Sequence, residues 1–334
     1  MSEDASLNSG RASAHRRVFC AGIPLFLLAS SALAQAWLAP KGEASFGLAY
    51  QNLYTRDHLS SEGEKYDGGR IRMNIVVIGL TYSFTDRLSA GASLPYVSAR
   101  YDGTLPHVAS SLELIDDGSY HDSFTDLRLD LRYNLWHEPA MITPFFSAII
   151  PIRDYWTFAH SNLSSGLEQY LVGVSAGRRL DPILETGFVQ LRYSYAFAEK
   201  VLGVSHDRSN LDLEIGYFLT PSLGVSALGS YQKTYGGLDL PLPGTPENAA
   251  FRRTPYYVRH DQLARSDYLN VGGIVSYALT GTVDVFASYQ ATVWGTNMHA
   301  IQPGLAIGMS WGFSPKRVIR SFVRKSATGE PATD

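Results

Sequence analysis

The sequence predicts an all-β fold, a transmembrane antiparallel up-and-down β-barrel of about twelve strands. Segments of about 10 to 14 residues alternate polar and apolar side chains, and helical spacing fits none of them well. The connections between these segments alternate between short and long. An even number of strands with short turns on one rim and long loops on the other is typical of bacterial outer-membrane barrels.

The clearest strand is the segment at residues 123–136, SFTDLRLDLRYNLW. Every second position from Phe124 carries Asp126, Arg128, Asp130, Arg132 or Asn134, and the positions between them carry four leucines and a tyrosine. Because side chains alternate across a strand, one face is charged and the other is apolar. A soluble sandwich has the same pattern when its leucines face the core. The segment lengths favour the membrane, since a tilted strand crosses a bilayer in about 9 to 11 residues.

Residues 1–34 are predicted to be a secretory signal peptide. Arg16 and Arg17 precede an apolar run at residues 18–28, and the small residues around Leu33 offer a cleavage site before Gln35. The run is too short to cross a bilayer of about 30 Å as a helix, although a retained anchor is the alternative. The only cysteine, Cys20, lies in this run, so the exported chain is expected to have no disulfide, Cys-ligated metal or Cys nucleophile.

The predicted barrel covers residues 35–313. Its twelve strands are expected at residues 44–54, 70–84, 88–101, 123–136, 141–153, 168–180, 187–198, 208–219, 223–232, 267–279, 283–292 and 301–313. The short turns are residues 85–87, 137–140, 181–186, 220–222 and 280–282. The opposite rim has long loops at residues 55–69, 102–122, 154–167, 199–207 and 233–266 and a shorter one at residues 293–300. This layout predicts the outer membrane of a Gram-negative bacterium, with both termini in the periplasm.

Aromatic residues gather near the ends of these segments, where a membrane interface places them. They are Tyr54, Tyr82, Phe84, Tyr96, Tyr101, Trp136, Tyr217, Tyr231, Tyr277, Trp294 and Trp311. The last segment also ends in an aromatic residue, Phe313, which is typical of the C-terminal signal read by the outer-membrane barrel-assembly machinery. Residues 314–334 then form a basic tail, expected in the periplasm as either a short helix or a disordered segment.

The mature chain resembles the phenol-degradation (meta-pathway) family of outer-membrane transporters. The likeness lies in residues 39–50, 75–97, 119–135 and 210–237, and it covers most of residues 40–313. The family usually has Gly-Asp where this chain has Thr125-Asp126, and the basic tail is an addition. The resemblance implies passive passage of small aromatic or otherwise hydrophobic molecules across the outer membrane, and it carries over no active site.

Charged residues on three predicted strands are expected to face the lumen and to form a constriction that selects solutes. They are Asp126, Arg128, Asp130, Arg132, Arg192, Asp212 and Glu214. The alternative is that paired charges fill the lumen for stability, because a barrel of twelve strands lies between filled and open sizes. The interleaved arginines hold the acids ionised, so no catalytic carboxylate pair is predicted.

The longest loop is a candidate for the mouth of the pore. Folded inward, Arg252, Arg253, Tyr256, Tyr257 and Arg259 favour anionic or aromatic solutes. Folded outward, they form a solvated surface that meets lipopolysaccharide phosphates, which is the interpretation we favour. The predicted partners are therefore outer-membrane lipids and a small solute. The formal charge of −3 gives no indication of nucleic acid.

No cofactor is predicted, and no catalytic or metal-ligating set emerges from spacing along the chain. His121 and Ser123 have the His-x-Ser spacing of an outer-membrane lipid hydrolase, and odd positions there are expected to face lipid. No acid or amide partner for them is evident on the neighbouring segment, so an enzyme is not expected. The nine histidines are scattered, and His260-Asp261 comes nearest to a metal-ligand pattern.

Overall fold

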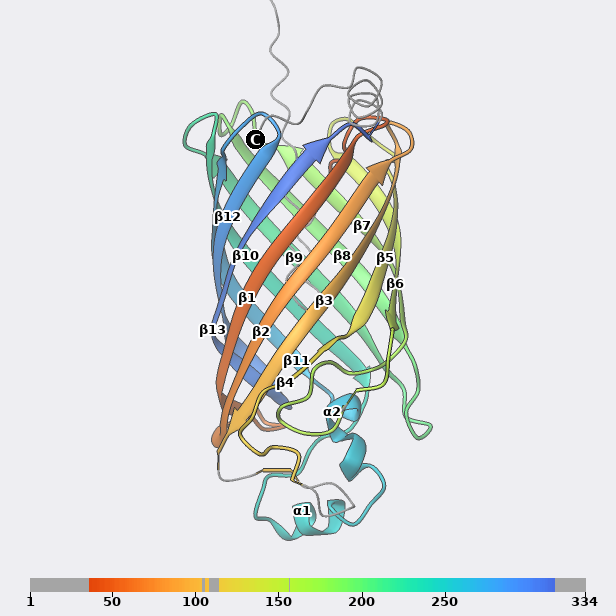
Figure 1. The fold of residues 1–334 in the computed structure, drawn as a ribbon, viewed down its shortest axis with the longest axis vertical. Coiled ribbons are helices and arrows are strands. Elements are labelled where there is room, and N and C mark those ends of the chain that lie inside the picture. Colours follow the sequence, from red (N-terminus) through yellow and green to blue (C-terminus); the bar gives the residue numbers. More distant parts are fainter. Residues whose placement is uncertain (1–35, 104–105, 108–113, 156, 316–334) are drawn as a thin grey trace, which may run out of the picture.

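The computed structural model of the chain is a closed β-barrel (Figure 1). It describes residues 36–103, 106–107, 114–155 and 157–315. The predicted signal peptide and almost all of the predicted tail lie outside the described residues. No helix in the described part of the chain has the length and apolar character needed to cross a membrane.

The predicted strands are confirmed, and each is antiparallel to its neighbours. They are β1 (Ala44–Leu59), β2 (Lys65–Ser83), β3 (Leu88–Asp102), β4 (His121–Phe124), β5 (Asp126–Tyr133), β6 (Met141–Pro151), β7 (Gln169–Arg179), β8 (Gly187–Ala198), β9 (His206–Phe218), β10 (Leu223–Gly236), β11 (Asp267–Ala278), β12 (Val283–Thr296) and β13 (Met298–Phe313). Pairing of β1 with both β2 and β13 closes the cylinder, and β4 and β5 share one place beside β3. Twelve strand positions therefore surround the lumen.

Two of the loops predicted on the rim opposite the short turns are largely strand and form hairpins. β1 runs on to Leu59 and β2 begins at Lys65, so most of residues 55–69 is strand. Likewise β12 runs to Thr296 and β13 begins at Met298. The three short helices α1 (Pro246–Phe251), η1 (Tyr257–Arg259) and α2 (His260–Leu263) lie at the end with the long loops. The short turns and the end of β13 lie at the opposite end (Figure 1).

A β-bulge separates β4 from β5. Tyr96 of β3 is opposite Phe124, and Ser93 of β3 is opposite Arg128. The step between these two pairs is three residues on β3 but four residues on the β4–β5 side. The extra residue places Thr125 and Asp126 both inside the barrel, and it reverses the faces of β4. The expectation that Phe124 shares the polar face is therefore wrong, because its side chain lies on the outer surface.

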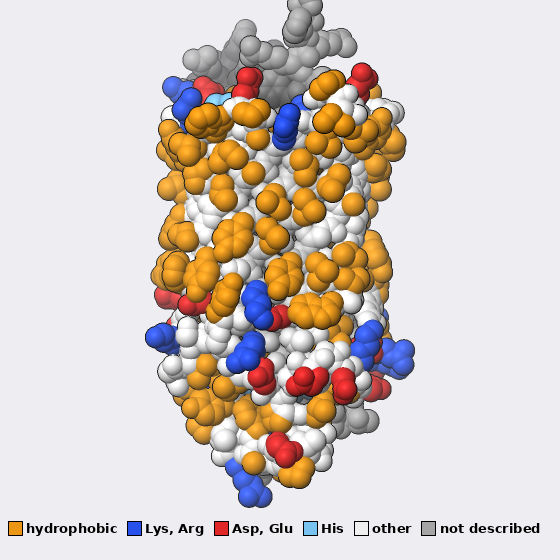
Figure 2. All heavy atoms as spheres, turned by 180° about the vertical axis from the view of Figure 1, so that it is seen from behind, with side chains coloured by type: hydrophobic (Ala, Val, Ile, Leu, Met, Phe, Trp, Pro, Cys, Tyr) orange, Lys and Arg blue, Asp and Glu red, His pale blue; other side chains and the backbone are white. Residues whose placement is uncertain are grey.

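The outer surface of the cylinder is apolar, as predicted. Leu129 and Leu131 of β5 are 40% and 48% exposed, while Arg132, the residue after Leu131, is buried inside the barrel. In Figure 2 a broad hydrophobic band lies between a charged upper rim and a lower zone rich in Lys, Arg, Asp and Glu. A band of this kind is what a membrane-spanning barrel presents to lipid. The leucines therefore face the surroundings and not a core.

Most of the predicted aromatic residues lie on this outer surface, among them Trp136, Trp294 and Trp311. Tyr101 is an exception. It is only 1% exposed, and its hydroxyl donates a hydrogen bond to the carbonyl oxygen of Gly68 at 2.8 Å inside the barrel. Its side chain therefore belongs to the interior and not to an interfacial belt.

Candidate functional site: the barrel lumen

The structure brings the predicted lumen charges together. Arg192 of β8 lies opposite Asp212 of β9 in register, and its Nη2 is 3.9 Å from Oδ1 of Asp130 on β5. The inward residues of β5 and β9 complete the cluster: Asp126, Arg128, Arg132 and Glu214. We call these seven side chains the charge cluster. Their position inside the barrel follows from the period-two pattern, whereas their role in selecting solutes is not tested by the fold.

Neighbouring hydroxyl and amide groups hold the carboxylates of the charge cluster. Ser230 Oγ donates to Asp212 Oδ1 at 2.6 Å, and Gln190 Nε2 donates to Glu214 Oε2 at 3.2 Å. The Arg192 guanidinium stacks on the ring of Phe145, with 3.7 Å from Cζ to the ring centroid. A cation over an aromatic face is favourable where water is excluded, so this wall of the lumen combines charge with aromatic surface.

The connection between β6 and β7 folds into the barrel. Leu163 is 5% exposed and packs in an apolar cluster on the inner wall, which contains Leu53, Ile75, Val77, Val97 and Ala99 of β1, β2 and β3. The hydroxyls of Tyr155 and Ser164 in the same connection donate to Asp126 of the charge cluster. The lumen is therefore not uniformly polar. An apolar wall on β1–β3 and a charged wall on β5, β8 and β9 meet at this inserted loop.

The segment before β1 also enters the lumen, near the end with the short turns. The Ala36 amide donates to Oε1 of Gln190 at 3.2 Å, and its carbonyl accepts from Thr143 Oγ1 at 2.6 Å. Trp37 packs edge-on against Phe188. Gln190 and Thr143 lie close to the starts of β8 and β6. This placement could not be predicted from residue patterns, because the segment carries no strand or helix pattern.

The loop between β10 and β11 covers the opposite end of the lumen. α2 holds Gln262 and Leu263 buried, and Gln262 Nε2 donates to the carbonyl oxygen of Ser165 in the inserted loop at 2.7 Å. Beneath this cover lies a cavity of about 340 Å³ that Arg252 and Tyr257 help to line. Arg253 and Arg259 are exposed, and Tyr256 does not line the cavity. Only two of the five predicted mouth-loop residues therefore border it.

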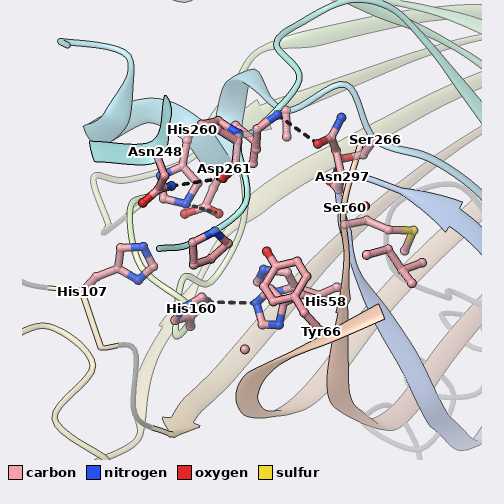
Figure 3. Close-up of a pocket in the computed structure, with 18 of the residues that line it drawn as sticks. His58, Ser60, Tyr66, His107, His160, Asn248, His260, Asp261, Ser266 and Asn297 are labelled. Carbon is pink, nitrogen blue, oxygen red and sulfur yellow. Dashed lines mark hydrogen bonds and ion pairs between the residues drawn. The ribbon is translucent and has the colours of Figure 1, made fainter. Parts of the chain in front are cut away.

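Histidines from distant parts of the chain converge on the wall of this cavity (Figure 3). His58 comes from β1, His299 from β13 and His160 from the inserted loop. His107 lies in the connection between β3 and β4, and His260 is the first residue of α2. Burial lowers the pKa of the His160 imidazole, so that ring is neutral at neutral pH. The histidines are scattered along the sequence, but the expectation that they form no cluster is wrong for these five. Spacing along the sequence cannot reveal such a cluster, since these residues meet only when the barrel closes.

The pair considered for lipid hydrolysis is not on the lipid face. The β-bulge turns Ser123 inward, where it is 9% exposed, and its hydroxyl donates to the carbonyl oxygen of Phe124 at 2.8 Å. His121 Nε2 lies 3.4 Å from Asp117 instead. The expectation that odd positions face lipid at this point is therefore wrong, because the extra residue changes their side.

No family model matches the sequence, and a search of curated proteins finds no match. Among solved structures, a COG4313 outer membrane channel from Pseudomonas putida F1 has a TM-score of 0.62 at 14% identity, covering 84% of this chain and 98% of that one. The NanC porin gives 0.45 at 10% identity, covering 79% and 98%. The CymD monoaromatic hydrocarbon channel gives 0.41 at 13% identity, covering 82% and 89%. The first of these likenesses shows that this chain has the fold of an outer-membrane barrel.

Proposed function

We propose that the chain is a passive channel for small molecules with an aromatic or other apolar part, in the outer membrane of a Gram-negative bacterium. One observation carries this proposal: the apolar wall and the charge cluster border the same inserted loop. Such a lumen offers apolar contact to the aromatic or apolar part of a solute and charge to its polar group. The resemblance to the phenol-degradation family agrees with this class of solute.

Transport in this proposal is diffusion down a concentration gradient. The solute first enters the cavity beneath the outer cover, and then displaces the inserted loop around Leu163 from the apolar wall. It then reaches the Arg192 guanidinium that stacks on Phe145. The arginines favour an anionic group such as a carboxylate, by charge and by donated hydrogen bonds. The short turns and both ends of the mature chain lie in the periplasm, and the long loops face lipopolysaccharide outside.

The test is solute flux into liposomes that contain the purified mature chain. We expect benzoate and phenol to enter faster than glucose, a larger solute without an aromatic ring, after correction for leakage into empty liposomes and for the difference in size. Phenol crosses lipid unaided, so benzoate is the more informative solute. Equal rates for benzoate and glucose would contradict the selectivity.

A structural barrel with a filled lumen is the second candidate, and two contacts favour it. The Ala36 backbone is hydrogen-bonded to Gln190 and Thr143 near the end with the short turns. Leu163 is packed into the inner wall toward the opposite end of the barrel. If both segments stay in place permanently, the proteoliposomes admit no solute above the background of empty liposomes. The flux experiment therefore separates the two functions.

A further inference from the structure

We propose that His58, His160 and His299 form a binding site for a late first-row divalent metal ion, of which zinc is the reference case. One ring nitrogen from each lies within 4.8 Å of the others. Neutral imidazole is a common ligand for zinc, copper and nickel ions. The three rings stand on the wall of the cavity beneath the outer cover, where Figure 3 shows His58 and His160 facing each other.

The spacing of the first two ligands already fits a metal ion. His58 Nε2 and His160 Nδ1 are 3.3 Å apart. Two imidazole nitrogens at about 2.0 to 2.1 Å from a tetrahedral zinc ion are about 3.3 to 3.4 Å apart. The His299 ring lies against His58, with 4.0 Å between ring centroids. A ring nitrogen of His299 lies within 4.8 Å of the other two ligand atoms, so binding requires this ring to move closer to them.

Packing orients two of the three rings. Gly68 lies so close to His58 that a Cβ built on it would be 2.0 Å from Nδ1, which leaves Nε2 to face the cluster. That buried Nδ1 has no hydrogen-bond partner among the described residues. His160 stacks on Tyr101 with 4.4 Å between centroids and an interplanar angle of 21°. Rings held in place by packing lower the cost of assembling a metal site.

The loop that carries His160 is anchored by Asp116. The carboxylate accepts the amide of His160 at 3.2 Å, the amide of Ser161 at 2.9 Å and the hydroxyl of Ser161 at 2.7 Å. It also lies 2.9 Å from Nδ1 of His107. Asp116, His107 and His160 make a second group at ligand spacing. Because the Asp116 oxygens are already occupied, we assign the metal to the three histidines and give Asp116 the role of holding the loop.

The position of the site gives it a physical consequence. A metal ion held there ties the rim formed by β1 and β13 to the inserted loop between β6 and β7, through His160. That same loop carries Leu163 into the inner wall. Metal binding is therefore expected to stabilise the inserted loop. The binding itself does not depend on whether the barrel transports solute.

The experiment is titration calorimetry of the mature chain in detergent with zinc chloride, with no polyhistidine tag on the protein. We expect one zinc ion per chain, and binding weakened more than about 100-fold by His160→Gln and by His299→Gln. His137→Gln is the matched control, because His137 is exposed in a short turn at the other end of the barrel. Heat-dependent migration in electrophoresis checks that each variant is folded.

Three results would overturn the proposal. They are absence of zinc binding by the folded wild-type chain, unchanged affinity in both histidine variants, and loss of binding in His137→Gln. An equal loss in Asp116→Asn and His107→Gln, with His299→Gln unaffected, would move the site to the second group and contradict our assignment. Flux of benzoate is measured separately, so failure of the metal site and failure of the channel are distinguishable.

Discussion

Replacing Arg128, Arg132 and Arg192 together with serine should make the lumen strongly cation-selective. The charge cluster formally holds four negative and three positive groups, so the variant keeps only Asp126, Asp130, Asp212 and Glu214. A potassium ion about 8 Å from one unit charge interacts with it by about 0.5 kcal/mol in water. Removing three positive charges therefore favours the cation by roughly 1.5 kcal/mol before screening, and salt at about 0.1 M reduces this by about half. The anion is disfavoured by the same amount, so the cation-to-anion permeability ratio should rise about tenfold.

The assay is the reversal potential of single channels in a planar bilayer under a potassium chloride gradient. The matched control replaces Arg252, Arg253 and Arg259 with serine, which removes the same charge from the outer cover. We expect that control to shift the ratio much less, because Arg253 and Arg259 are exposed to bulk water. A conducting triple variant with the wild-type ratio would refute the reasoning, since the arginines would then not line the path of the ions.

Two further substitutions test the segments inside the barrel. Leu163→Ala removes about 2 to 5 kcal/mol of packing from the inserted loop, so single-channel recordings should show larger or more frequent openings than Leu213→Ala, which alters the outer surface. Wild-type behaviour would mean that the loop does not limit conduction. At Gly177 an added Cβ would lie only 2.7 Å from Ala36 and 2.9 Å from Trp37, so Gly177→Val should displace the segment before β1 and raise the conductance. Gly229→Val has open space and should not, and equal traces from the two would contradict the placement.

The strands could be predicted because their pattern has a direct physical cause. Lipid outside and water inside require opposite side chains at successive positions, and β5 shows this most clearly with Leu129 outward and Arg132 inward. The bulge at Thr125 could not be predicted, because one extra residue leaves the alternation intact on each side of it. It changes only which positions of β4 face inward relative to those of β5. The faces of Ser123 and Phe124 were therefore assigned the wrong way round.

The contents of the lumen could not be predicted for a different reason. Nothing in the loop around Leu163 distinguishes an apolar anchor inside the barrel from one in an external loop. The contact of Ala36 with Gln190 joins residues far apart in the sequence, as does the meeting of His58 with His299. Such contacts are set by closure of the barrel and by the register of β1 with β13, which a pattern of period two does not specify.

The most direct test of the account is thiol labelling of single-cysteine variants in proteoliposomes, for which the predicted loss of Cys20 with the signal peptide provides a background without thiols. Ser288→Cys places the thiol on the lumen side of β12, at a partly exposed position between the buried Phe286 and Gln290, and Leu213→Cys places it on the outer surface of β9. A charged thiol reagent that cannot enter lipid should modify the first variant and leave the second unmodified. Modification of the second with protection of the first would contradict a water-filled barrel with an apolar exterior.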